Sequence, residues 1–193
     1  MLLISWPSSS NLTYAGDAVD LEQSIDELNA LLTLAADAIG HDRIVMMAHS
    51  MGSRGVVDAL KARSDAAQFR GAIFVAPDIR RDVFRENVTM LQQKVTDIVV
   101  YMSDHDRALW LSTTVNVSGR LGVAKEFDID HTTVIDVTPT GINDISGHLY
   151  HMLNPAVIED LRVLLGTTPD DAERSYHRVP GEMPGFWQLQ PVP

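Results

Sequence analysis

The sequence predicts an α/β fold in which a mostly parallel sheet carries helices on both faces. Short apolar runs alternate with segments of helical periodicity along the 193 residues. Such alternation is typical of parallel sheets, because crossover helices join their strands. A chain of this length can bury one good hydrophobic core. Strands are expected near residues 2–5, 43–48, 71–75, 96–102 and 132–136, and helices near residues 17–39, 51–64, 80–93, 105–116 and 155–165.

Local patterns justify these elements in chain order. Residues 2–5 form a short apolar run, and the later strands read as continuous apolar runs, as in strands buried on both faces. The segment 17–39 carries an apolar stripe at helical spacing, which we expect in the core. Its members are Val19, Leu21, Ile25, Leu28, Leu31, Leu32 and Leu34. The connection from Pro77 to Thr96 is too short to hold a large cap, which predicts an open or shallow crevice.

The composition changes after Leu165, where prolines and polar residues replace the periodic pattern. We therefore divide the chain into a domain at residues 1–165 and a Pro-rich C-terminal tail at residues 166–193. Phe186 and Trp187 in this tail are expected to pack onto the domain or onto a second protomer, and partial disorder is an alternative.

The most informative motif is Ala48-His49-Ser50-Met51-Gly52, where an apolar strand ends at a serine and a helix follows. This pattern is typical of a nucleophile elbow, which exposes the serine hydroxyl and places the next backbone N–H, that of Met51, where it can bind an oxyanion. Ala48 occupies a position that is usually glycine in this motif, and its methyl group is the smallest side chain that could replace glycine there. The plainer interpretation is a serine that caps a helix after a buried strand.

Carboxylates that could orient a catalytic base follow the apolar strand at residues 96–102. Asp106 fits the expected short loop better than Asp104, although either could instead cap the helix that follows. Asp78, after the strand at residues 71–75, is a third candidate, for which helix capping ahead of Val83 is the favoured interpretation.

His148 is the preferred base among seven histidines, because it follows a glycine in a loop beyond the last predicted strand. His151 is its rival, and the two could also be read as metal ligands, but no further ligand cluster accompanies them. His49 is interpreted as a wall of the crevice or a packed strand-end residue. The order Ser50, Asp106, His148 is that of alpha/beta-hydrolases, in which the histidine takes the serine proton while the acid fixes its tautomer.

The chain resembles bacterial alpha/beta-hydrolases of a family catalogued as of unknown function and described as esterase- or lipase-like. The resemblance covers most of residues 1–165 and rests on these segments: Ser5-Trp6-Pro7-Ser8 with Tyr14 and Asp17, Ala48 to Gly52, Ala76-Pro77-Asp78, Ser103 to Leu109, and Gly147-His148-Leu149-Tyr150. It implies an alpha/beta-hydrolase-type fold, with Ser50 as nucleophile, Asp106 as acid and His148 as base.

The chain departs from that family at its start, because it opens on the segment that resembles the fourth strand of the fold. An upstream strand and its His-Gly segment, which would supply the second oxyanion donor, are missing from the given sequence. Three arrangements follow: the sequence is part of a longer protein, residues 2–6 move into the vacant sheet position, or a second protomer supplies a strand in a homo-oligomer. In the second arrangement Ser8 or Ser9 becomes the missing donor, since Pro7 has no N–H; of these we name Ser8.

Composition excludes several functions. The formal net charge of -11 argues against nucleic-acid and anionic-membrane binding. Zero cysteines exclude disulfides and thiol catalysis, and no phosphate loop is present. A cytoplasmic location is expected, because the start of the sequence has no recognisable signal peptide.

We therefore expect a serine carboxylic-ester hydrolase for small, short-chain esters, with no metal or cofactor. Met51 and Trp110 are expected to form walls of an acyl pocket, with a core position as the alternative for Trp110. A catalytically impaired binding domain is the alternative from another class. The same triad could also cleave amides, thioesters or lactones, or transfer an acyl group.

Overall fold

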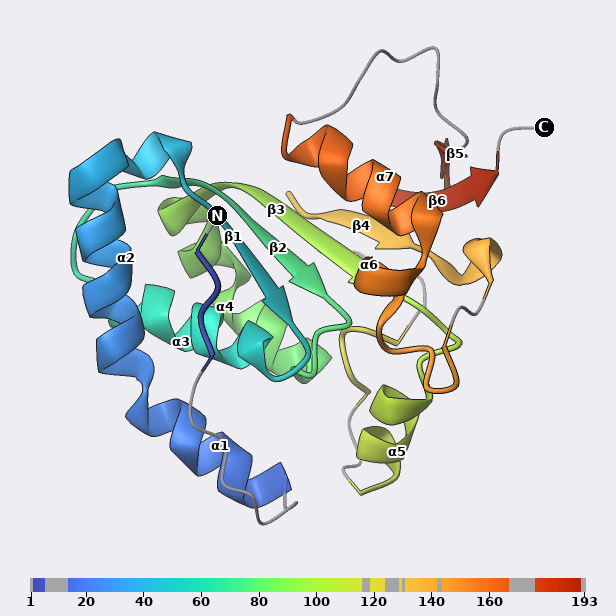
Figure 1. The fold of residues 1–193 in the computed structure, drawn as a ribbon, viewed down its shortest axis with the longest axis horizontal. Coiled ribbons are helices and arrows are strands. Elements are labelled where there is room, and N and C mark those ends of the chain that lie inside the picture. The colour runs from blue at the N-terminus through green and yellow to red at the C-terminus, as the bar shows by residue number, and fades with distance from the viewer. Residues whose placement is uncertain are drawn as a thin grey trace.

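The computed structural model describes residues 2–5, 14–115, 119–123, 129, 131–141, 144–166 and 176–191. Within these residues six strands form one sheet in the order β1-β2-β3-β4-β6-β5 (Figure 1). The first four neighbouring pairs along the sheet are parallel, and the β5–β6 pair is antiparallel. The strands are β1 (Val45–His49), β2 (Phe69–Val75), β3 (Val95–Met102), β4 (Thr133–Asp136), β5 (Tyr176–Pro180) and β6 (Phe186–Pro191). The predicted mostly parallel α/β fold is confirmed.

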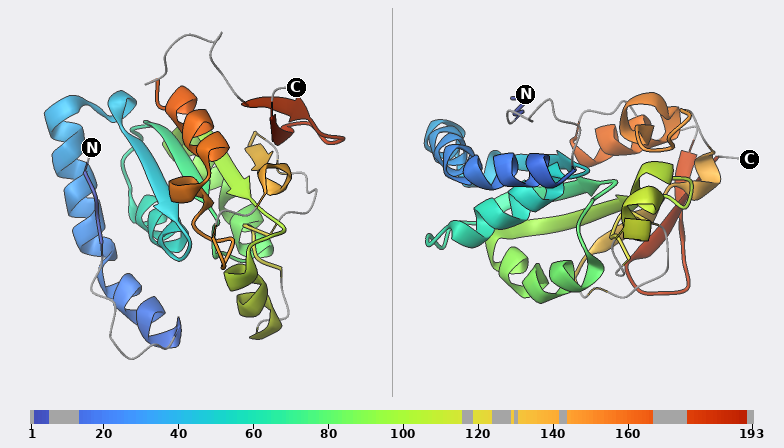
Figure 2. Two further views of the ribbon diagram at one scale, coloured as in Figure 1. Left: turned by 45° about the vertical axis from the view of Figure 1, so that its right-hand side comes forward. Right: turned by 90° about the horizontal axis from the view of Figure 1, so that it is seen from below.

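Helices cover both faces of the sheet, and the view from below shows the green helix at residues 81–94 on one side and the orange helix at residues 155–164 on the other (Figure 2). One layer contains α2 (Ile25–Ile39), α3 (Gly52–Ala62) and α4 (Arg81–Lys94), with α1 (Tyr14–Gln23) beside α2 and α3. The other contains α6 (Tyr150–Leu153) and α7 (Pro155–Leu164). Helix α5 (Arg107–Val115) follows β3, and two 3-10 turns, η1 (His41–Arg43) and η2 (Thr138–Thr140), complete the described helices. The described residues include no large cap domain.

Alternate residues of the central strands enter two cores. Ala72 and Phe74 of β2 pack with α3 and α4, whereas Ile73 and Val75 pack with α7. This follows from the two-residue period of a strand, which sends successive side chains to opposite faces. Because β2 and β3 are covered on both sides, their sequences are apolar without alternation.

The strand expected at residues 2–5 is wrong. These residues have no regular structure, and Leu2 and Leu3 are exposed. Their trace is the dark blue segment at the N-terminus (Figure 1). Strand β1 therefore forms an edge of the sheet in the described residues, and its Met47 is exposed. An apolar run of four residues indicates burial or extension but does not specify a partner strand, which explains the error.

The helix expected at residues 17–39 is two helices that meet at Ser24. The Ser24 hydroxyl donates to the carbonyl of Asp20 at 2.8 Å, a local bond that competes with regular helix geometry. The change of direction also changes which side of the helix faces the core. Leu21 and Leu32 are buried, but Leu31 and Leu34 are exposed, so the expectation that the whole stripe is core is wrong.

The described residues of the predicted tail extend the sheet. Strand β6 pairs in parallel with β4, and β5 pairs with β6 as a hairpin. Phe186 is buried in one core and the partly buried Trp187 packs against the other, so both pack onto the domain as expected. Prolines end both strands, where a missing N–H is tolerated, and they made the segment look irregular in sequence. The domain boundary at residue 165 stays a prediction.

Among the described residues, none of the helices has the length and apolar character needed to span a lipid bilayer.

Candidate active site

Ser50 occupies a strained turn between β1 and α3. Its φ is 53°, in the left-handed region that non-glycine residues rarely adopt. The turn is held from two sides, because the Ser50 N–H donates to the Val75 carbonyl at 3.0 Å and the Ser50 carbonyl accepts from the Asp78 N–H at 3.1 Å. This is the backbone geometry expected of a nucleophile elbow.

The start of α3 supplies N–H groups beside Ser50. Met51 is the N-cap residue of α3, and the first N–H groups of any α-helix have no acceptor within the helix. These groups, with the positive end of the helix dipole, can stabilise a developing oxyanion. Ser8, named from the sequence as the second donor, lies outside the described residues.

The end of β2, beside the elbow, is strained as well. Ala76 has a φ of 47°, and its N–H donates to the Tyr150 hydroxyl at 2.8 Å. That hydroxyl donates in turn to the Tyr101 carbonyl at 2.9 Å. Burial, and then the charge of Asp106, raises the pKa of Tyr150 well above its usual value, so the hydroxyl keeps its proton. Tyr150 therefore ties α6 to the strand ends that surround the elbow.

Asp78 forms a buried ion pair with Arg120, with Nε and Oδ1 2.9 Å apart. Its backbone carbonyl also accepts from Arg54 Nε at 2.9 Å. The expected helix-capping role of Asp78 is wrong, since α4 begins three residues later with Arg80 at its N-cap. Arg120 was missed from the sequence because 42 residues separate it from Asp78 and no local pattern connects them. The pair holds the loop that donates to the Ser50 carbonyl.

Asp106 and His148 are brought together. Nδ1 of His148 lies 2.7 Å from Oδ2 of Asp106, and Oδ1 of Asp106 accepts from the Leu109 N–H at 3.0 Å. The Asp106 side chain is fully buried. Asp104 is exposed and its N–H donates to the Thr138 hydroxyl, so it lies apart from this pair. Of the three carboxylates weighed from the sequence, only Asp106 contacts the proposed base in the described residues.

The loop that carries His148 is packed against the start of α5. Gly147 has a φ of 65°, and a Cβ built there would lie 2.1 Å from the His105 carbonyl oxygen. The Arg107 N–H donates to the Ser146 carbonyl at 2.9 Å, and the His148 N–H donates to the Ser146 hydroxyl at 3.2 Å. Glycine at position 147 is therefore required by both conformation and space.

Hydrogen bonds also keep the side chain of Asp144, near the start of this loop, ionised. Burial raises the pKa of Asp144, but hydrogen bonds from the Ser146 hydroxyl and from nearby backbone N–H groups outweigh it and lower that pKa. A charged carboxylate is therefore kept at the base of the loop.

Three histidine rings stack beside the elbow. The His49 ring centroid lies 4.5 Å from that of His148 and 4.3 Å from that of His151. Burial, and then the charges of His151 and His148, lowers the pKa of His49 to about 4. Burial and the charge of His148 also lower the pKa of His151. At neutral pH His49 is therefore uncharged.

His151 contacts His49 and not Asp106, so the geometry favours His148 over its rival as the base. Within the described ranges, no group of three or more histidine, cysteine or acidic side chains is arranged to hold a metal ion.

Ser50 is half-buried, and among the described residues its hydroxyl makes no hydrogen bond to His148. Such bonds are often long without substrate and shorten in the Michaelis complex. The link that the structure does contain runs through the neighbour of Ser50: Nε2 of His49 lies 3.1 Å from the His148 carbonyl oxygen.

Trp110 lies on the first turns of α5, four residues after Asp106, and its side chain is 61% exposed. The core alternative for Trp110 is therefore wrong. A role as a wall of the acyl pocket stays a prediction.

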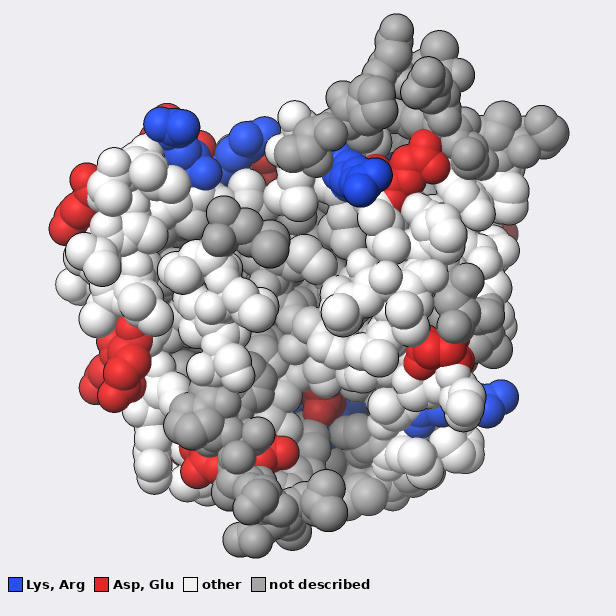
Figure 3. Space-filling model, viewed as in Figure 1, with Lys and Arg blue, Asp and Glu red and all other residues white. Residues whose placement is uncertain are grey.

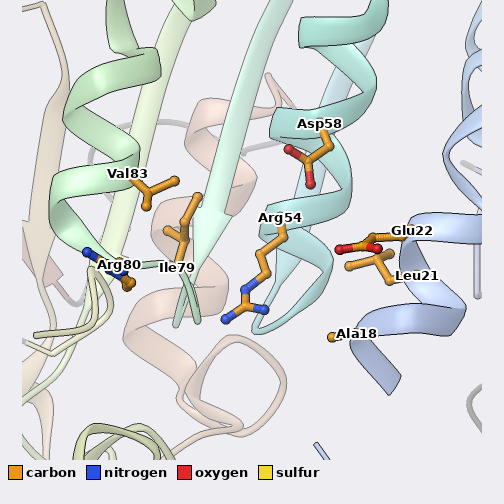
Figure 4. Close-up of a pocket in the computed structure, with 8 residues that line it drawn as sticks. All are labelled: Ala18, Leu21, Glu22, Arg54, Asp58, Ile79, Arg80 and Val83. Atoms are coloured by element: carbon orange, nitrogen blue, oxygen red, sulfur yellow. The ribbon is translucent and has the colours of Figure 1, made fainter. Parts of the chain in front are cut away.

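A separate pocket of about 250 Å³ lies between α1, α3 and the start of α4 (Figure 4). Its walls combine apolar side chains with two acids and two arginines: Ala18, Leu21, Glu22, Arg54, Asp58, Ile79, Arg80 and Val83. None of Ser50, Asp106 and His148 lines it, so this pocket is separate from the elbow.

A comparison with protein-family models found one that matches residues 1–167, described as "Alpha/beta hydrolase of unknown function (DUF900)". No curated protein and no solved structure matches the chain.

Proposed function

The chain belongs to this family of alpha/beta-hydrolases of unknown function, and on that basis we propose that it is a serine hydrolase of the carboxylesterase type that cleaves small, short-chain esters through an acyl-enzyme. The observation that carries the proposal is the hydrogen bond of His148 to the buried Asp106, beside a serine in a strained elbow. A buried carboxylate on Nδ1 leaves Nε2 of the ring to accept a proton, which is the requirement for a general base.

In the proposed acylation step, Ser50 Oγ attacks the ester carbonyl carbon and His148 Nε2 takes the hydroxyl proton. Asp106 accepts the hydrogen bond from Nδ1 throughout and stabilises the imidazolium. The carbonyl oxygen becomes an oxyanion beside the Met51 N–H at the start of α3. When the tetrahedral intermediate collapses, the imidazolium gives its proton to the departing alkoxide, and the acyl group stays on Ser50.

In the proposed deacylation step, water repeats the attack. His148 takes a proton from the water as its oxygen adds to the acyl carbon, and returns a proton to Ser50 Oγ when the acid is released. The reaction needs only protein groups and water. The second oxyanion donor, for which we propose Ser8, lies outside the described residues.

The surroundings of the elbow favour a small substrate. The segment between β2 and β3 holds only α4 and short connections, so it contributes no cap that would enclose a long chain. Lys and Arg side chains form only small groups on the face seen in Figure 3. With the formal net charge of -11, this supports an uncharged small-molecule partner over nucleic acid or an anionic membrane.

A catalytically impaired binding domain remains the second candidate. The observation that favours it is that Ser50 and His148 make no hydrogen bond in the described part of the chain.

The test is hydrolysis of p-nitrophenyl acetate, butyrate, octanoate and palmitate by the wild-type protein beside Ser50→Ala. Ser64→Ala, which alters an exposed serine in the connection after α3, is the matched control. We expect turnover of the two short esters by wild type and Ser64→Ala and none by Ser50→Ala. Turnover that survives in Ser50→Ala would rule out the serine mechanism. If the folded wild-type protein shows no turnover, the second candidate function, a binding domain, is favoured.

A further inference from the structure

His49 connects the strand that carries Ser50 to the loop that carries His148. It is the last residue of β1 and pairs with Val75 in the parallel ladder, so its backbone is fixed. Its Nε2 atom lies 3.1 Å from the carbonyl oxygen of His148. His148 itself stands outside regular structure, between Gly147 and the start of α6 at Tyr150. A side chain on a rigid strand therefore contacts the backbone of the proposed base.

The contact fixes the tautomer of His49. A carbonyl oxygen can only accept, so the ring nitrogen that faces it must carry the proton. His49 therefore donates from Nε2, and its Nδ1 carries no proton in the neutral ring. Because burial keeps the ring neutral, it places no positive charge beside His148 when that residue is protonated during the reaction.

The backbone of His148 is consequently held on both sides. The Ser146 hydroxyl accepts from its N–H at 3.2 Å, and His49 donates to its carbonyl. The rings of His49 and His148 also pack together at 4.5 Å between centroids, with the rings tilted by 49°. Asp106 orients the ring of His148 at Nδ1, whereas His49, the residue before the nucleophile, contacts the backbone of His148.

We propose that His49 is a positioning residue, which sets the distance between His148 Nε2 and Ser50 Oγ by donating a hydrogen bond to the His148 carbonyl. This rests on the proposed function. A displacement of about 1 Å between reacting groups can cost roughly 10²-fold in rate, so the hydrogen bond affects kcat and leaves KM for a small ester nearly unchanged.

Two variants separate the hydrogen bond from simple ring packing. His49→Gln keeps an N–H donor at a position similar to Nε2 but loses the ring, whereas His49→Phe keeps a ring and loses the donor. With p-nitrophenyl butyrate we expect His49→Gln to stay within about 5-fold of the wild-type kcat and His49→Phe to lose about 10- to 100-fold, with KM unchanged in both. The reverse order would overturn the proposal in favour of ring packing, and equal activity of both variants would overturn it as well.

The same substitutions in a His148→Ala background test whether His49 acts through His148. If it does, His49→Phe has no further effect there, because the group it positions is already gone. A further loss of the same size in that background would show that His49 acts by another route, and the proposal would fail.

A readout that does not depend on turnover keeps this inference separate from the proposed function. We expect the Nδ1–H proton of His148, bound to Asp106, to give a strongly deshielded NMR resonance, which its loss in Asp106→Asn would identify. We expect the resonance in wild type and His49→Gln and its broadening or loss in His49→Phe. A sharp, unshifted resonance in folded His49→Phe would overturn the proposal even if Ser50→Ala had already disproved ester hydrolysis.

Discussion

Nδ1 of His148 lies 2.7 Å from Oδ2 of Asp106, across 42 residues of sequence. The contact joins the loop after β4 to the start of α5, and it buries the carboxylate completely. A buried carboxylate that holds one nitrogen of an imidazole whose side chain is 14% exposed is an arrangement for proton transfer at the other nitrogen.

Asp106→Asn is expected to lower kcat by roughly 10³–10⁴-fold, because an amide can present its NH₂ to His148 and stabilise the wrong tautomer. Asp104→Asn is the matched control, since Asp104 is exposed and its backbone, not its side chain, bonds to Thr138. Steady-state ester hydrolysis by both variants provides the test. Equal losses would show that Asp106 has no special role.

Gly147→Ala is expected to unfold more easily and to lose activity, because the added Cβ would lie 2.1 Å from the His105 carbonyl oxygen. The left-handed conformation alone costs a non-glycine residue about 1–2 kcal/mol. Gly166→Ala isolates that cost, since Gly166 has a similar φ of 68° but no atom within 4 Å of the added Cβ. Urea unfolding should show a clearly larger loss for Gly147→Ala; similar losses would contradict the packing described for this loop.

Removal of either partner of the Asp78–Arg120 pair is expected to lower the free energy of unfolding by about 3–5 kcal/mol, because the other charge stays buried. The double variant Asp78→Asn/Arg120→Met should lose less than the sum of the two single variants. Asp82→Asn, in an exposed pair with Arg80, should cause no measurable change. Chemical denaturation of these four variants and of the wild-type protein measures the differences, and additive losses would argue against an interaction between Asp78 and Arg120.

The free energy of unfolding should fall as pH is lowered from about 6.5 to about 4, in part through His49. The folded state holds the pKa of His49 at about 4, below the ordinary value of 6.5, so in this window the unfolded chain binds the extra proton. At 1.36 kcal/mol per pKa unit the effect is at most about 3–4 kcal/mol, and solvent screening of the partly exposed ring reduces it. Above pH 6.5 both states hold neutral His49, and the contribution of this residue is constant.

His49→Gln should flatten that pH dependence, which urea unfolding at pH 7.5, 6, 5 and 4.5 would show. His151, whose pKa is also lowered, and the titrating carboxylates remain in both proteins. The difference between wild type and variant therefore isolates His49. Parallel curves would contradict a buried neutral His49.

Local sequence patterns predicted the elements that surround the elbow. An apolar strand, Ser50 between small residues and the helix after it are adjacent in sequence, so the strand period and the turn chemistry are visible together. Asp106 and His148 were reached through chain order and loop position, and the structure brings these two together.

The features that the sequence did not predict depend on distant partners or on exceptions to propensity. Arg120 could not be connected to Asp78, and the contact of His49 with the His148 carbonyl involves a backbone atom with no sequence signature. Prolines made the segments of β5 and β6 look irregular in sequence, and the pairing of β6 with β4 is non-local. The apolar residues 2–5 suggested a strand, but pairing requires an available neighbour as well as an apolar pattern.

The most direct test of the central claim, that Ser50 is an activated nucleophile, is peptide mass spectrometry after exposure of the protein to a fluorophosphonate probe. We predict one phosphonyl adduct, on Ser50, that forms much more slowly in His148→Ala and Asp106→Asn. An adduct on another serine, or none on the folded wild-type protein, would contradict the account.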